Sequence, residues 1–208
     1  MPAILTNSLP DLKKKLKRIR DLSDWLQLDI MDGRFVKNIS VNLADLKKIK
    51  FPKNLEIHLM VENPEKYFQD CQRLKAKRVI FHIEATKNPL KVLKEMKRYQ
   101  FERGMALNPE TKIEKIKPYL NQLDLVLFLG VTPGFQGQKF NPIVLGKIKN
   151  FRKIFPKIKI GVDGGINLEN IKKISQAGAD YLVVGSYLFQ SKNIKKAYQL
   201  LKLEITTL

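Results

Sequence analysis

The residues best suited to acid–base chemistry are two aspartates and a histidine, Asp29, His58 and Asp163, each inside an alternating apolar stretch. Successive side chains of a β-strand point to opposite faces. Leu28 and Ile30 therefore lie on the face opposite Asp29, and the same alternation separates His58 and Asp163 from their apolar neighbours. In a closed sheet, the two carboxylates and the imidazole would converge on the interior.

Two ionised carboxylates in a narrow cavity repel each other and lose hydration unless a positive charge offsets them. A divalent cation held between the three side chains would supply that charge. A single strand histidine is usually a hydrogen-bonded core residue, and a single aspartate at a strand end usually caps a helix or a turn. The convergence of all three favours a functional site. For His82, which also follows a strand, a supporting role and a purely structural role are equally open.

Glycine-rich segments follow three further candidate strands, at residues 134–138, 164–165 and 185–186. Glycine lets backbone N–H groups approach an anion closely, and the last loops of a (β/α)8 barrel commonly hold a phosphate. Any one of these segments alone could be a simple turn. Three of them at one end of a barrel predict a phosphate cradle.

Short apolar stretches alternate with lysine-rich helical patterns along the whole chain, which is typical of parallel βα units. A doubly wound sheet would have a glycine-rich turn after its first strand, and residues 6–9 (TNSL) contain no glycine. Eight units in 208 residues average roughly 26 residues each and predict a single-domain α/β fold, a (β/α)8 TIM barrel over residues 1–208. We predict strands near 3–5, 25–30, 55–59, 78–83, 104–107, 125–129, 158–162 and 181–184, and helices near 11–19, 43–49, 64–74, 89–99, 113–120, 144–154, 168–176 and 193–203.

The chain is strongly basic, with 39 Lys and Arg against 20 Asp and Glu and a net charge of +19. The lysines are spread over nearly every amphipathic segment, which is typical of solvated helix faces. Zinc-finger spacing, an arginine-rich tail and an aromatic RNA motif are all missing from the sequence, so we expect no nucleic-acid partner. A positive surface would favour encounter with small phosphorylated substrates.

The single cysteine, Cys71, excludes an intramolecular disulfide and a thiolate metal cluster. The first residues lack the pattern of a signal peptide, and no apolar stretch approaches the ~18 residues of a membrane span. We therefore expect a cytoplasmic protein without a membrane partner.

A series of motifs resembles the ribulose-phosphate 3-epimerase family over essentially the whole chain. In chain order the motifs are LDIMDGRFV (28–36), HLMVENPEKY (58–67), FHIEA (81–85), ALNP (106–109), PGFQGQKF (133–140), VDGG (162–165) and AGAD (177–180). The resemblance implies a cytosolic, metal-dependent TIM barrel of the pentose phosphate pathway. Such an isomerase interconverts D-ribulose 5-phosphate and D-xylulose 5-phosphate, and the resemblance also implies a homo-oligomer.

The same resemblance implies roles for individual residues. Asp29 and Asp163 would be the two proton-transfer residues, one on each side of the substrate carbon, and both would be metal ligands. His58 would bind metal and touch substrate, and Met31 and Met60 would line the reaction chamber. One carboxylate removes a proton beside the ketone and the other, as a carboxylic acid, returns one to the opposite face, while a cation stabilises the enediolate. The phosphate-binding stretches match Gly134, Phe135, Gln136, Gly137, Gly164, Gly165, Gly185 and Ser186.

The chain departs from the family at Gln27, where a histidine ligand is usual, and at Ala3, where a substrate-contacting serine is usual. Gln136 also replaces a glycine of the family. An amide oxygen is a poorer zinc or iron ligand than imidazole but can serve harder ions such as Mg²⁺ or Mn²⁺.

Three outcomes for the metal are open. Gln27 coordinates through its oxygen, or Asp29, His58 and Asp163 hold the ion with water, or the site is empty. Because both acids and His58 are present, the first two outcomes are favoured, with one divalent ion among Mn, Fe, Zn, Co and Mg as cofactor.

Two other functions compete with the pentose phosphate epimerase. One is epimerisation of a ketohexose 6-phosphate such as allulose 6-phosphate. The other, suggested by the net charge and by the lost histidine, is a degenerate, non-catalytic barrel that binds a sugar phosphate or another polyanion.

Overall fold

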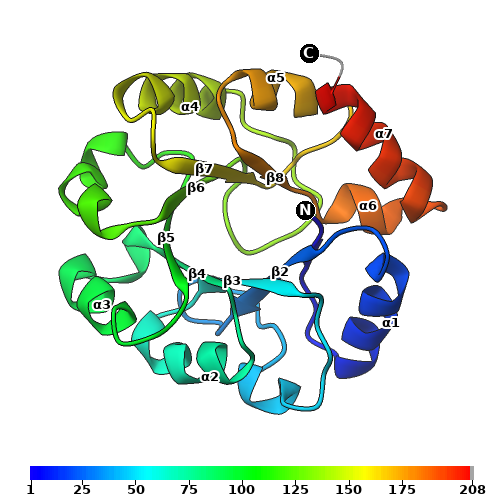
Figure 1. Ribbon diagram of the computed structural model, residues 1–208, viewed down its shortest axis with the longest axis horizontal. Helices are drawn as coiled ribbons and strands as arrows, with labels where there is room; N and C mark the ends of the chain where they lie inside the picture. The colour runs from blue at the N-terminus through cyan, green and yellow to red at the C-terminus, as the bar shows by residue number, and fades with distance from the viewer. Residues whose placement is uncertain (207–208) are drawn as a thin grey trace.

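The strands of the computed structural model, which describes residues 1–206, follow one another around a closed sheet (Figure 1). Eight parallel strands pair in chain order. The first and last meet through a bridge between Pro2 and Val184, where the Ala3 N–H donates to the Val184 carbonyl at 3.1 Å. The predicted (β/α)8 barrel is therefore confirmed. Residues 207 and 208 of the range predicted for it lie outside the described residues.

The strands line the inside of the ring and the helices surround it (Figure 1). The strands are β1 (Ala3–Ile4), β2 (Trp25–Met31), β3 (Asn54–Met60), β4 (Arg78–His82), β5 (Glu102–Leu107), β6 (Leu125–Leu129), β7 (Lys159–Asp163) and β8 (Tyr181–Val183). The helices are α1 (Leu9–Ile19), α2 (Phe68–Arg73), α3 (Pro89–Met96), α4 (Ile143–Ile154), α5 (Ile171–Gln176), α6 (Ser186–Gln190) and α7 (Ile194–Thr206).

The alternation of each strand divides the apolar side chains into two cores. Outward-facing residues such as Leu28 and Ile57 join a large cluster between the strands and the helices. Inward-facing residues such as Ile80 and Leu127 form a second, smaller cluster in the barrel interior. Both sets are fully buried, and each such side chain contributes roughly 1.5–3 kcal/mol to folding. The barrel is thus filled rather than hollow over most of its height.

Three predicted helices differ from the structure. Residues 43–49 form only a short 3-10 turn at Leu43–Leu46, and residues 64–74 begin with a 3-10 turn before α2. Residues 113–120 form two 3-10 turns, Ile113–Lys115 and Lys117–Gln122, instead of an α-helix. Pro118 explains this last difference, because proline lacks an N–H and disfavours helical geometry in the residue before it.

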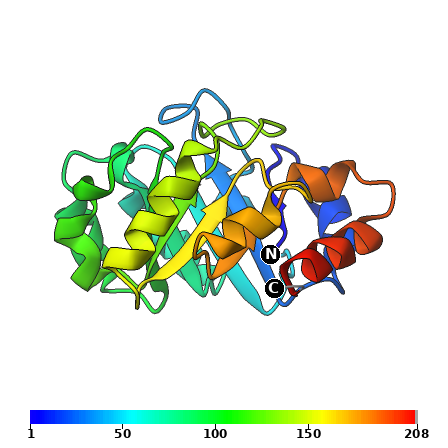
Figure 2. The ribbon, with the colours of Figure 1, turned by 90° about the horizontal axis from the view of Figure 1, so that it is seen from above.

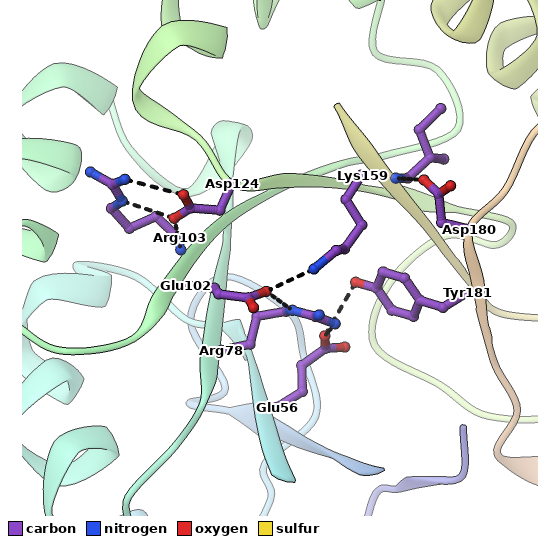
Figure 3. A network of polar contacts seen from close by, with 9 residues as sticks. Glu56, Arg78, Glu102, Arg103, Asp124, Lys159, Asp180 and Tyr181 are labelled. Atoms are coloured by element: carbon purple, nitrogen blue, oxygen red, sulfur yellow. Dashed lines mark hydrogen bonds and ion pairs between the residues drawn. The ribbon is translucent and has the colours of Figure 1, made fainter. Parts of the chain in front are cut away.

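An ion network centred on the buried Arg78 and Glu56 lies at the amino-terminal end of the barrel (Figure 3). The Arg78 guanidinium donates to Glu56 at 2.6 Å and to Glu102 at 2.9 Å, and Lys159 lies 3.3 Å from the same Glu102 oxygen. Tyr181 donates its hydroxyl to Glu56 at 3.2 Å. The Arg78 side chain also lies over the ring of Tyr181, with 4.7 Å between its Cζ and the ring centroid. The predicted acid–base residues lie toward the opposite end, where the strands end.

Candidate active site

The strand register brings the predicted acid–base residues together at the carboxyl ends of the strands. Asp29 of β2 pairs in register with His58 of β3. Asp163, the last residue of β7, lies between Leu129 of β6 and Val183 of β8. All of these side chains point into the barrel, as the alternation predicts. The convergence of Asp29, His58 and Asp163 inferred from the sequence is therefore confirmed.

The three side chains form a compact, buried group. The Nδ1 atom of His58 lies 3.4 Å from Oδ1 of Asp29 and 3.5 Å from Oδ2 of Asp163. One ligand atom from each residue lies within 4.8 Å of the other two, so the group could hold a metal ion. Two carboxylate oxygens and one imidazole nitrogen are a donor set suited to divalent ions such as Mn²⁺, Fe²⁺ and Zn²⁺. The residues present therefore fit a divalent cation.

Gln27, two residues before Asp29 on the same inward face, reaches into this group with its amide. Its Nε2 donates to Oδ1 of Asp29 and to Oδ2 of Asp163, at 2.7 Å in each case, and lies 3.5 Å from Nδ1 of His58. Gln27 is fully buried, and its Oε1 has no hydrogen-bond partner among the described residues. The structure thus presents the amide nitrogen to the acids, whereas one of the three outcomes left open by the sequence has Gln27 coordinate through its oxygen.

A chain of hydrogen bonds leads outward from His58 to Glu84. The Nε2 atoms of His58 and His82 are 2.9 Å apart, and Nδ1 of His82 lies 3.3 Å from Oε2 of Glu84. An ionised carboxylate only accepts hydrogen bonds, so His82 carries its proton on Nδ1 and accepts at Nε2. His58 therefore keeps a proton on Nε2 and turns Nδ1 toward the two aspartates. His82 therefore orients His58 through this hydrogen bond. The sequence left open whether His82 has such a supporting role or a purely structural one.

Burial and charge set the protonation of the group. Burial raises the pKa of Asp29, and the nearby charge of Asp163 raises this pKa further, although hydrogen bonds from His58 and Gln27 oppose the shift. Burial alone would lower the pKa of His58, but its hydrogen bonds and charge interactions with Asp163 and Asp29 outweigh burial and raise this pKa to about 9. One buried acid that favours its protonated form is what a proton donor requires.

The charge of Glu84 makes the stability of the fold around the site depend on pH. Burial alone would raise the pKa of Glu84, but hydrogen bonds from His82, Thr111 and the Asn108 N–H outweigh burial and lower it to about 2. A depressed pKa stabilises the fold above the unfolded value of about 4.3, and this stability disappears as the pH falls toward 2. We expect Glu84→Gln to lower the free energy of unfolding at pH 7 by on the order of 3 kcal/mol.

Urea denaturation of wild type and Glu84→Gln from pH 7 to pH 2.5 checks this expectation. The gap between the two proteins should narrow steadily below about pH 4.5. Glu114→Gln, a change to an exposed glutamate, serves as the control and should show no such trend. A gap between wild type and Glu84→Gln that stays constant over this range would contradict the role assigned to the Glu84 charge.

A pocket opens above the acids, at the end of the barrel where the strands end. Its walls carry twelve of the residues predicted as catalytic or substrate-binding. These are Asp29, Met31, Met60, Gly134, Phe135, Gln136, Gly137, Asp163, Gly164, Gly165, Gly185 and Ser186. The remaining one, His58, is fully buried, as is Gln27, which was predicted only as a metal ligand. The acids and the three glycine segments therefore share one cavity.

Glycine is required where the loops after β6 and β7 touch. Gly165 has a φ of +69°, and a Cβ at this position would lie 2.5 Å from the backbone nitrogen of Phe140. The Asn141 N–H donates to the Gly130 carbonyl at 2.7 Å and holds together the two ends of the loop after β6. Backbone packed this closely holds the glycine segments in place around the pocket.

Two loops rise above the barrel on the pocket side, one after β2 and one after β6 (Figure 2). The Asn38 side chain of the first loop donates to the Gly134 carbonyl of the second at 3.0 Å. A Cβ at Gly134 would lie 3.3 Å from Cβ of Val36, so the loops also pack against each other. The ring of Phe135 is 61% exposed at the edge of the pocket. These loops form the outer wall of the cavity.

Several pocket residues were absent from the predicted set, including Leu5, Leu129, Ile166 and Val183. Leu129 and Val183 flank Asp163 in register, so the inward alternation of β6 and β8 could have identified them. Ala3, where the sequence analysis expects a substrate-contacting serine, also lines the pocket. Apolar residues carry no chemical signal of their own, which explains why motif reasoning missed them.

Comparison with known proteins adds the following. A family model described as the ribulose-phosphate 3 epimerase family matches residues 1–189. A Helicobacter pylori ribulose-phosphate 3-epimerase is 36% identical over 204 residues, covering 95% of this chain and 94% of the relative. A Methanocaldococcus jannaschii protein of the same name is 35% identical over 207 residues, covering 96% and 88%. The rice protein named as the cytoplasmic isoform is 34% identical over 195 residues, covering 90% and 86%.

Solved structures agree on the architecture. The 3-hexulose-6-phosphate synthase of Salmonella typhimurium superposes with a TM-score of 0.76 at 14% identity, covering 99% of this chain and 97% of that chain. At 14% identity this similarity supports the barrel fold alone. Among the described residues, no helix has both the length and the apolar character needed to span a membrane.

Proposed function

The chain belongs to the ribulose-phosphate 3-epimerase family, and from this premise we propose that it uses Asp29 and Asp163 as the two acids that interconvert D-ribulose 5-phosphate and D-xylulose 5-phosphate. One observation carries this proposal. The two carboxyl groups meet on the wall of a pocket whose rim is built from glycine-rich loops. Epimerisation beside a ketone needs a base on one face of the carbon and an acid on the other. A phosphate bound at the rim would hold that carbon over the acids.

The two acids need opposite protonation states at the start of each turnover. Burial raises the pKa of Asp29, which favours a carboxylic acid able to donate a proton. The second acid of the pair must then begin as the carboxylate that removes the proton from the other face. In the reverse direction the roles exchange, because the product leaves the proton on the opposite residue. Met31 and Met60 wall the pocket and limit the access of water.

A divalent cation fits beside these acids, held by Asp29, His58 and Asp163. When bound, the ion would stabilise the negative charge that develops on the substrate oxygens. His58 must give up its Nδ1 proton to become a ligand, while the hydrogen bond to His82 keeps the other proton on Nε2. Two carboxylate oxygens and one imidazole nitrogen accept several divalent ions, so the assay below compares Mn²⁺, Mg²⁺, Zn²⁺, Fe²⁺ and Co²⁺.

The phosphate group is proposed to bind the loops that contain Gly134, Gly137, Gly164, Gly165 and Gly185. Gly185 offers the sharpest test, because its φ is −101° and a Cβ there would meet only ordinary contacts, with Ala3 at 3.5 Å and Gln136 at 3.6 Å. We expect Gly185→Ala to fold normally and to raise KM for the phosphorylated substrate about 10-fold with little change in kcat, because the added methyl enters the cradle.

Steady-state kinetics of Gly185→Ala beside Gly146→Ala check this expectation. Gly146 lies in α4 with open space around it, so its replacement should leave both constants unchanged. An unchanged KM in a folded Gly185→Ala protein would mean that the phosphate binds elsewhere.

The decisive assay is incubation of the pure protein with D-ribulose 5-phosphate, with Mn²⁺, Mg²⁺, Zn²⁺, Fe²⁺ and Co²⁺ each supplied in turn. We expect D-xylulose 5-phosphate to form with at least one ion, and kcat/KM to be higher for the pentose phosphate than for allulose 6-phosphate. Failure with every ion would reject the proposal, and a higher kcat/KM for the hexose would assign a ketohexose 6-phosphate epimerase instead.

We further propose that the protein works in the cytoplasm as a homo-oligomer. The name of the rice relative supports the location. Light scattering of the purified protein measures the assembly directly, and a mass equal to that of a single chain would reject the oligomer.

A further inference from the structure

The amide of Gln27 occupies the space between the groups that would hold a cation. Its Nε2 lies 2.7 Å from Asp29, 2.7 Å from Asp163 and 3.5 Å from His58, so one atom contacts all three candidate ligands. The side chain is fully buried, so water cannot compete for these hydrogen bonds. Hydrogen bonds shielded from water in this way are electrostatically stronger than exposed ones.

The orientation of this amide follows from its neighbours. With the amide reversed, Oε1 would lie at the same short distances from two carboxylate oxygens, with three acceptors facing one another. Only a cation or additional protons could offset that repulsion. In the observed orientation both N–H groups are used, and Oε1 is left without a partner among the described residues. Leaving the buried Oε1 without a partner costs free energy, and in this orientation the two N–H groups lie between the acids.

We propose that Gln27 is a positioning residue that takes the place of the cation in the metal-free protein. Its amide joins Asp29 and Asp163, so the two acids stay converged before any ion arrives. The inference rests on the proposed function of these acids but concerns the protein without metal. Its consequence is that folding of the site does not depend on metal loading, and that an arriving ion must displace the amide nitrogen from both carboxylates.

The most direct test observes the amide itself. The protein is labelled with ¹⁵N at glutamine side chains and stripped with EDTA, and Gln27→Glu identifies the Gln27 signal. We expect the two Gln27 amide protons to exchange with solvent at least 100-fold more slowly than those of the exposed Gln72, and Mg²⁺ at saturation to shift the signal. Exchange as fast as that of Gln72 in the metal-free protein would overturn the proposal.

A second test measures the thermal midpoint, Tm, with and without metal. Gln27→Glu keeps the size of the side chain but replaces the two donors with a third carboxylate. We expect the Tm of the EDTA-treated variant to fall by about 5–10 °C, and excess Mn²⁺ to close the gap to Mn²⁺-loaded wild type to within about 2 °C. Gln72→Glu, the same replacement on the surface of α2, should change neither value.

These outcomes distinguish a Gln27 amide that holds the two acids together from a Gln27 side chain that only fills space. A side chain that only fills space would lower Tm equally with and without Mn²⁺, and that result would overturn the proposal, as would an unchanged metal-free Tm. A variant that folds only when Mn²⁺ is present would support it. Neither readout requires turnover, so an inactive wild-type protein with a protected Gln27 amide would reject the proposed function and leave this inference standing.

Discussion

Replacing Asp29 by asparagine is expected to lower kcat for epimerisation by about 10²–10⁴-fold while the barrel stays folded. Asparagine has nearly the same shape as aspartate but can neither take up nor release the substrate proton. Asp163→Asn should have an effect of similar size, because each acid serves one face of the same carbon. The two losses should not multiply in the double variant, since removal of either acid already interrupts the transfer.

Progress curves of D-xylulose 5-phosphate formation measure these losses, and circular dichroism checks the fold. Asp45→Asn is the matched control, because Asp45 is exposed on the Leu43–Leu46 turn and does not line the pocket. It should retain wild-type kcat. A variant of either buried aspartate that keeps more than about a tenth of wild-type kcat would contradict the assigned role.

The largest loss of stability is expected at the other end of the barrel, from Arg78→Met. Arg78 is 4% exposed and pairs with Glu56, which is fully buried and whose pKa is raised by that burial despite the Arg78 charge. Removing one partner of a buried ion pair leaves the other charge without compensation, which typically costs about 3–5 kcal/mol. The lost contacts of the guanidinium with the rings of Trp25 and Tyr181 add to this cost.

Urea denaturation provides the free energy of unfolding for Arg78→Met, Glu56→Gln and the double variant. The double variant should be more stable than the sum of the two single losses indicates, because neither charge is then left unpaired. Arg98→Met removes an exposed pair with Glu95 and should cost less than about 1 kcal/mol. If Arg78→Met costs no more than Arg98→Met, the buried network contributes nothing to stability.

The barrel and its inward-facing acids could be predicted because they depend on simple periodicities. The strand alternation around Asp29, His58 and Asp163 determines which side chains enter the interior, and the parallel register then brings them to one end. The gathering of the glycine segments could also be predicted, because the loops that follow the strands of a barrel all lie at one end. For these features, the residue pattern within each segment and the closed barrel place the side chains in the same positions.

The rest of the site depends on contacts between distant segments. The direction of the Gln27 amide is decided by Asp163, which lies 136 residues away in the sequence. The role of His82 depends on its 2.9 Å contact with His58 and on Glu84, which is itself held by Asn108 and Thr111. A single sequence does not specify such pairings. The α-helix expected over 113–120 is absent for a local reason, because Pro118 lies within the segment and disfavours helical geometry in the residue before it.

The central claim is that two acids on opposite faces of one carbon exchange its proton, and product formation in D₂O tests this most directly. Wild-type protein is incubated with D-ribulose 5-phosphate and the activating ion in D₂O, and the D-xylulose 5-phosphate formed is examined by NMR. We predict one deuterium at carbon 3 in the product from its first appearance, because the acid that returns the proton has equilibrated with solvent. Product that retains the original hydrogen at carbon 3 would contradict the account.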